Sequence, residues 1–164
     1  MALTLQLNID GKENLVRMMD KITLLSSVDM EQFFYVIKDW FFDSQKKIFK
    51  TEGQHLNEQW KALTPEYAEW KQENYPNQPI LQMTGALYSA MTSDGGNTST
   101  TINRKDMRIE VNDIVYLRTH DRGRKQGKGE IPQRQFLGTN PVMLVDLDKR
   151  MQKKLNELLK EQLT

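Results

Sequence analysis

Hydrophobic and polar residues alternate in the opening stretch LTLQLNID, in which every second residue from Leu3 to Ile9 is apolar. A period of two predicts a strand with one buried face. The stretches TSTTINR and DMRIEVN alternate in the same way, and a tight turn near Lys105-Asp106 separates them. They predict a β-hairpin near 98–111, so the N-terminal strand and the hairpin together predict a small antiparallel sheet.

Apolar residues recur at spacings of three and four in the longer segments, which predicts helices. The first runs from Lys12 to about Leu25, and the second carries an aromatic stripe from Met30 to Ile48 with Ser27 as its N-cap. The last begins at Asn140-Pro141, and its apolar face consists of Leu144, Leu147, Met151, Leu155, Leu158 and Leu159. Because burial of each such side chain is worth about 1.5 to 3 kcal/mol, this C-terminal helix must dock on the body or on a neighbour.

Two shorter helices are predicted between the aromatic helix and the hairpin. Thr64 precedes Pro65 as a cap before a first-turn proline, and Pro76 helps to end that helix. The segment ILQMTGALYSAM starts extended, turns at Thr84-Gly85 and continues at helical spacing. Together these elements predict an α+β fold in a single domain over 1–164, with the sheet packed against the aromatic helix and the C-terminal helix.

Composition and charge narrow the functional classes. The chain has 164 residues, 38% hydrophobic and 27% charged, as expected for one globular domain with a core. With 23 basic and 22 acidic residues the net charge is +1, which favours neither nucleic acid nor an anionic membrane as partner. No apolar run is long enough to span a membrane, and no basic-then-apolar leader is seen.

Metal and cofactor sites are not expected. Cysteine is absent, and the two histidines, His55 and His120, are far apart in the chain. A zinc site would therefore need carboxylates for most of its ligands. Neither GxxxxGK[ST] nor GxGxxG occurs, so nucleotide binding has no support.

Two sets of polar residues could suggest catalysis or cation binding. His120-Asp121 is an adjacent acid–base pair, but adjacent side chains rarely face each other, and no Ser, Cys or third carboxylate accompanies them. Asp106, Glu110 and Asp113 lie near a strand end but lack the dense oxygen-ligand spacing of a calcium loop. These patterns predict a protein that is not an enzyme and has no catalytic or metal-binding residue.

A basic loop is predicted at about 118–130. It carries five cations against one Asp, namely Arg118, Arg122, Arg124, Lys125 and Lys128. Its glycines give it flexibility, and it has no interleaved aromatics for base stacking. Three interpretations stay open: a solvated loop, a contact with an acidic protein surface, or a contact with DNA phosphate.

The segment EIPQRQFLG follows this loop directly. Pro132 fixes the backbone and favours an extended Ile131, so the apolar Ile131, Phe136 and Leu137 stand on a segment that is not helical. Such a segment buries its side chains in its own core or in a partner. It suits an arm that anchors a mobile loop against a packed surface.

Several blocks of sequence, in this order, resemble the phage virion morphogenesis family, which holds the tail completion proteins of contractile-tailed phages such as P2 and the Mu G-type proteins. The chain is also similar to HK97-type neck or tail-component proteins. The resemblance extends roughly from Trp60 to the end. The matching positions are Trp60, Leu63 and Thr64 of the first block, Leu81, Thr84, Gly85 and Leu87 of the second, and Ile131, Pro132, Arg134, Phe136, Leu137 and Gly138 of the third. The family usually has a second proline where Gln135 stands, and "YA-x-IHQ-G" where this chain has VYLRTHDRG.

The resemblance implies a structural virion protein, a tail completion or tail terminator protein or a neck protein. Such a protein forms a ring at the head-proximal end of a phage tail and enables head–tail joining. A hexamer is the expected ring, with a dodecamer second. The implied partners are further copies of the chain, tail tube or sheath proteins and neck or connector proteins, with passive contact to DNA in the lumen. Synthesis in the bacterial host cytoplasm and location in the virion follow.

Within that expectation, Ile131, Pro132, Arg134, Phe136 and Leu137 are predicted to form an assembly interface, and the basic loop to order against a neighbour or line a lumen. The alternative function is a small DNA-binding module that uses the loop at 118–128 and the hairpin. A hydrolase using His120, Asp121 and a carboxylate is a third, weaker reading without support from the resemblance.

Overall fold

The computed structural model describes residues 3–5, 30–124 and 130–162. In these ranges the helices are α2 (Glu31–Lys50), η1 (Gln54–Leu56), α3 (Pro65–Asn74), α4 (Ala86–Thr92), α5 (Leu117–Arg122) and α6 (Pro141–Gln162). The strands are β1 (Leu3–Leu5), β2 (Thr98–Ile102) and β3 (Met107–Val111). The predicted α+β class is confirmed. The predicted helix at 12–25, the cap Ser27 and the strand residues beyond Leu5 lie outside the described residues.

The strands form one antiparallel sheet, as the alternating patterns predicted. The structure adds their order, which is β1-β3-β2. Val111 pairs with Leu3 of β1 on one side and with Thr98 of β2 on the other. The hairpin turn is held by Asn103, whose Oδ1 accepts hydrogen bonds from the backbone N–H groups of Lys105 and Asp106 at 2.9 and 3.0 Å. A short polar side chain that bonds the backbone two residues on is what this turn requires.

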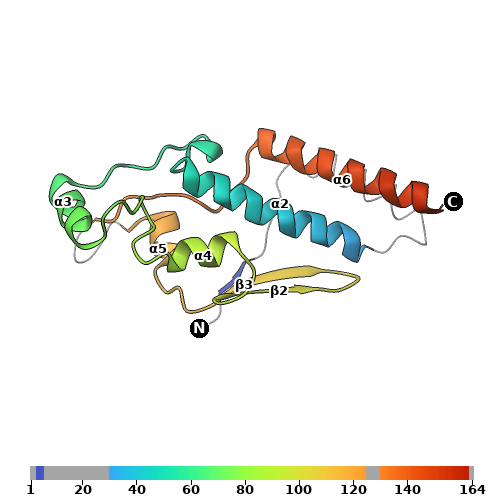
Figure 1. The fold of residues 1–164 in the computed structure, drawn as a ribbon, viewed down its shortest axis with the longest axis horizontal. Coiled ribbons are helices and arrows are strands. Elements are labelled where there is room, and N and C mark those ends of the chain that lie inside the picture. Colours follow the sequence, from blue (N-terminus) through green and yellow to red (C-terminus); the bar gives the residue numbers. More distant parts are fainter. Residues whose placement is uncertain (1–2, 6–29, 125–129, 163–164) are drawn as a thin grey trace.

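The long aromatic helix α2 is the centre of the molecule. Figure 1 shows α6 beside one face of α2, and α4 with the sheet beside the other. The indole Nε1 of Trp40 donates to the carbonyl of Met143 at 3.2 Å, and Arg150 on α6 bonds the carboxylate of Asp43 on α2 at 3.0 Å. The core therefore has two layers that share α2, and its buried aromatic residues face both ways.

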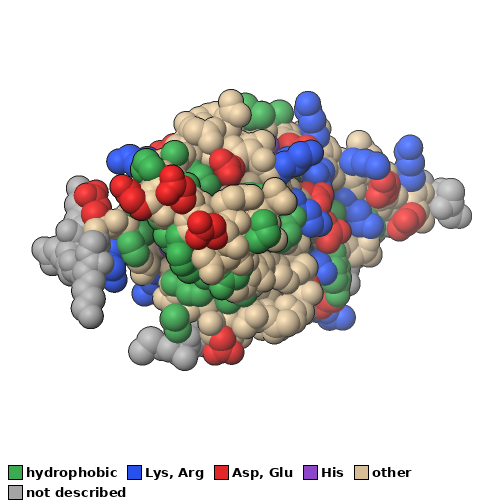
Figure 2. All heavy atoms as spheres, turned by 60° about the vertical axis from the view of Figure 1, so that its left-hand side comes forward, with side chains coloured by type: hydrophobic (Ala, Val, Ile, Leu, Met, Phe, Trp, Pro, Cys, Tyr) green, Lys and Arg blue, Asp and Glu red, His purple; other side chains and the backbone are tan. Residues whose placement is uncertain are grey.

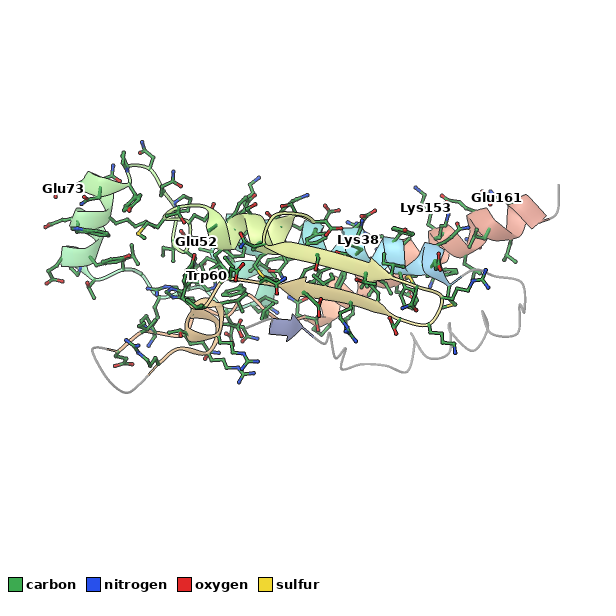
Figure 3. All side chains as sticks on the ribbon, turned by 90° about the horizontal axis from the view of Figure 1, so that it is seen from below. Lys38, Glu52, Trp60, Glu73, Lys153 and Glu161 are labelled. Atoms are coloured by element: carbon green, nitrogen blue, oxygen red, sulfur yellow. The ribbon has the colours of Figure 1, made fainter. Side chains whose placement is uncertain are left out.

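The predicted starts of α6 and α3 can be compared with the hydrogen bonds made there. Asn140 caps α6, because its Oδ1 accepts a hydrogen bond from the N–H of Met143 at 2.9 Å. Thr64 stands directly before α3 with Pro65 as the first helical residue, as predicted, but the Thr64 hydroxyl makes no cap hydrogen bond. Figure 3 shows Glu73, on α3, and Glu161, on α6, at opposite ends of the molecule.

Candidate functional site: a pocket and the surface around it

The segment at 131–138 is built into the body of this chain. The Phe136 side chain is fully buried, and its ring centroid lies 5.6 Å from that of Phe49. Trp60 packs edge-on against the same Phe49 ring at 5.4 Å. Phe136 thus belongs to an aromatic cluster at the C-terminal end of α2, and Figure 3 shows Trp60 and Glu52 in this region.

Three side chains from other elements hold the backbone of this segment. Gln45 Nε2 donates to the carbonyl of Phe136 at 3.1 Å, and Trp60 Nε1 donates to the carbonyl of Gln135 at 2.7 Å. Asp121 Oδ1 accepts from the N–H groups of Phe136 and Leu137 at 3.1 and 2.9 Å. An extended segment has no hydrogen bonds of its own, so these side chains supply the partners that its buried peptide groups need.

Arg134 is also buried, at 5% exposed. Its Nε donates to the carbonyl of Lys61 at 3.0 Å and its Nη2 to the carbonyl of Ala62 at 3.3 Å. The full burial of Phe136 contradicts its predicted place on an assembly surface. Arg134 makes these two contacts within the chain, and its role in an interface stays a prediction. Ile131, Pro132 and Leu137 are partly exposed, and their role in an interface stays a prediction.

The predicted basic loop is shorter than the sequence suggested. Residues 117–122 form α5, so Arg118 and Arg122 stand exposed on a helix instead of on a loop. Arg124 pairs with Ile131 through two backbone hydrogen bonds, of 2.8 and 2.9 Å, in an isolated antiparallel bridge. This bridge brings the residues on either side of the predicted loop together. Lys125 and Lys128 lie outside the described residues.

The surface beside this loop carries both signs of charge. A groove there is lined by the cations Lys61, Arg122 and Arg124 and also by the carboxylates Glu58 and Glu130. A surface that binds the DNA backbone is expected to present clustered cations. The part of the loop that the structure describes therefore does not present a purely basic face.

His120 and Asp121 make separate contacts within the chain. Asp121 Oδ1 accepts hydrogen bonds from the backbone N–H groups of Phe136 and Leu137, so this carboxylate holds the 131–138 segment in place. The His120 ring packs edge-on against Tyr116 at 5.8 Å, and its Nδ1 atom is buried with no hydrogen-bond partner. Burial, and to a lesser degree the nearby Arg134 charge, lowers the pKa of His120 below its ordinary value.

One pocket, of about 290 Å³, brings together the blocks of sequence that carry the family resemblance. Leu63 comes from the first block, Leu81, Thr84, Gly85 and Leu87 from the second, and Arg134 from the third. Tyr116 and His120, from the stretch VYLRTHDRG, complete one side. Segments that are far apart in the chain thus meet at a single place.

Exposed aromatic residues form the rim of this pocket on the α3 side. Tyr67 lines the pocket and stacks on Trp70 with ring centroids 5.5 Å apart, although the two side chains are 44% and 45% exposed. Met83 and Tyr116, which also line the pocket, are exposed as well. Figure 2 shows hydrophobic and acidic side chains next to each other on the face that this view brings forward. We call Tyr67, Trp70, Met83 and Tyr116 the rim cluster.

The aromatic part of the rim cluster on α3 was missed in the sequence because this helix has no apolar face that would mark its aromatic residues. Its one buried residue is Lys71, whereas the large aromatic residues Tyr67 and Trp70 face outward. Exposed apolar groups that cluster in this way mark contact sites more often than single exposed residues do. The signal that could have revealed it is a short helix rich in aromatics that lacks a clear apolar face.

Comparison of the chain with protein-family models, curated proteins and solved structures gives no match.

Within the described ranges, no group of three or more His, Asp or Glu side chains is placed to hold a metal ion. In the same part of the chain, no helix combines the length and the apolar character needed to cross a bilayer. The resemblance to the phage family stays a prediction.

Proposed function

We propose that this chain is a structural virion protein that forms a ring at the head-proximal end of a phage tail, as a tail completion, tail terminator or neck protein. The observation that carries the proposal is the convergence of the resembling blocks on one pocket. If these blocks were similar to the family by chance, nothing would require residues as distant as Leu63, Leu81 and Arg134 to meet. Their meeting is consistent with blocks that form one unit.

The rim cluster supports assembly by contact between proteins. Ring subunits make heterologous contacts, in which one patch meets a different patch on the next copy. The rim cluster is one such patch. Val142 and Val145, which are 71% and 53% exposed at the start of α6, offer a second, smaller apolar patch on a different element. Aromatic side chains are enriched where interfaces derive most of their binding energy.

The DNA-binding alternative receives less support. Its main feature was the basic loop, and the groove beside the described part of that loop includes two glutamates. If the alternative holds, the purified chain binds duplex DNA with an affinity that falls steeply as salt is raised. Virion assembly by protein contact predicts no such dependence for the isolated chain.

The native mass of the full chain, measured alone and in the presence of tails, tests the proposal. We expect a ring of several copies that copurifies with tails. The double variant Tyr67→Ser/Trp70→Ser should stay folded, because both side chains are half exposed, but should fail to assemble. Tyr35→Ser, at a residue 52% exposed on α2, is the matched control and should assemble normally. A chain that remains a monomer and never joins tails would remove the proposal.

A further inference from the structure

The pocket contains two buried cations without a carboxylate partner. Lys71 and Arg134 both line it and are each 5% exposed. Lys71 Nζ donates to the carbonyl of Pro79 at 2.5 Å, and Arg134 donates to the carbonyls of Lys61 and Ala62. Among the described residues, no carboxylate oxygen lies within 4.0 Å of either cation.

Such an arrangement is unfavourable unless something else compensates it. A buried charge is normally paired, because desolvation penalises the charged form, and neutral backbone carbonyls satisfy only part of the demand. Burial lowers the pKa of Lys71, and the more distant Glu52 carboxylate opposes this effect. Glu52 Oε1 is already occupied by the N–H of Ile80 at 3.2 Å.

A third polar side chain that lines the pocket, His120, has a ring nitrogen without a partner. The Nδ1 atom of His120 is buried and makes no hydrogen bond. A buried ring nitrogen without a partner is uncommon and calls for an explanation. The His120 ring lines the same pocket as the two cations, while its Nδ1 atom itself is shielded from solvent.

The other walls of the pocket are apolar, and they include Leu63, Leu81, Leu87 and the rim residues Tyr67 and Tyr116. A volume of about 290 Å³ lies at the small end of the range for ligand pockets, which suits a group the size of one residue. Lys71 and Arg134 place two cations in the wall of the pocket, and the Glu52 carboxylate, which does not line it, acts on both of them. A single carboxylate is an anion whose charge suits this arrangement.

We propose that this pocket binds a single carboxylate carried on an apolar, preferably aromatic, group of about one residue in size. The carboxylate accepts hydrogen bonds from Lys71 and Arg134, and the apolar group packs between the leucines and the rim tyrosines. The ligand is either a free acid of this kind or the C-terminal residue of a partner protein, which has the same chemistry. The proposal holds whether or not the chain forms a ring.

The test compares N-acetyl-phenylalanine with its amide, which has the same shape but no charge. Each is titrated into the full chain, and backbone amide chemical shifts are followed by NMR. We expect the acid to cause saturable chemical-shift changes at the pocket residues. The amide should bind with an affinity at least about tenfold lower. Equal binding of the two probes, or no binding of the acid, overturns the proposal without the need for any variant.

Lys71→Met supplies the second arm, since methionine keeps much of the buried stem and removes the charge. The acid should bind this variant about tenfold more weakly. Lys61→Met, at an exposed side chain whose backbone carbonyl receives Arg134, is the control and should bind as the unmodified chain does. Unchanged binding in folded Lys71→Met contradicts the assignment of the cation.

A short peptide that ends in phenylalanine separates the two sources of the carboxylate. Peptide binding about tenfold tighter than N-acetyl-phenylalanine assigns the pocket to a partner's chain end, because flanking residues then add contacts at the rim. Equal affinities assign it to a free acid. In both cases the peptide with an amidated C-terminus should bind more weakly than the peptide with a free C-terminal carboxylate. Equal binding of these two peptides contradicts the proposal.

Discussion

Replacing Phe136 with alanine tests whether the 131–138 segment belongs to the core or to an assembly surface. The Phe136 side chain is 0% exposed and its ring lies 5.6 Å from that of Phe49. Truncation of a fully buried phenylalanine to alanine removes about 3 to 5 kcal/mol, through lost transfer free energy and the cavity that remains. The free energy of unfolding of a domain is about 5 to 15 kcal/mol in total, so this single change removes about a fifth or more of it.

Urea unfolding followed by far-UV circular dichroism measures the effect. With a denaturant slope of about 2 kcal/mol per molar, the Phe136→Ala midpoint should fall by about 2 M. Val142→Ala, at a side chain 71% exposed on α6, is the control and should change stability by less than about 0.5 kcal/mol. The charged variant Phe136→Asp should fail to fold cooperatively, because its carboxylate would be buried without a cation beside it.

A loss smaller than about 1 kcal/mol in Phe136→Ala would refute this reasoning. It would mean that the Phe136 ring does not pack against α2, and that the 131–138 segment extends away from the rest of the chain. A folded Phe136→Asp protein that fails only in assembly would have the same meaning. In that case the sequence-based prediction of a surface interface at Phe136 would be right after all.

Two further predictions concern the polar groups near the segment. Asp121→Ala should lower the free energy of unfolding by about 1.5 to 3 kcal/mol, because two backbone N–H groups lose a charged acceptor. Asp121→Asn keeps an oxygen at this position and should therefore lower it by less. Equal losses in urea unfolding would argue against the acceptor role of Asp121. Burial lowers the pKa of both His55 and His120, so the folded state holds them neutral, and stability should be full above about pH 6.5 and fall as pH drops below it. His120→Gln should flatten this fall, and an unchanged pH profile in thermal melts would contradict the assignment.

Local patterns in the sequence determined most of the secondary structure that the structure describes. Periods of two and of three to four reflect which side chains share a face, and that geometry is fixed within a strand or helix. The hairpin, the aromatic helix and the capping of α6 by Asn140 all depend on contacts within a few residues, such as the bond from Met143 N–H to Asn140. The boundary between α5 and the basic loop was misjudged because the three glycines in RGRKQGKG extend a loop signal into a neighbouring helix.

Only the tertiary structure decided the surroundings of the 131–138 segment and the content of the pocket. Pro132 and the apolar residues of that segment predicted burial, but whether a partner or this chain covers them depends on residues far away, such as Trp60, whose indole reaches a carbonyl 75 positions later. The same holds for Arg134, which was predicted to lie in an assembly interface, and for Lys71, which no pattern in the sequence marked. Both are buried and line one pocket with His120. A sequence pattern encodes which face of an element is apolar. The surface that covers this face is set by how the elements pack. The free-energy cost of a buried charge depends on the same packing, because it is decided by the groups that surround the charge.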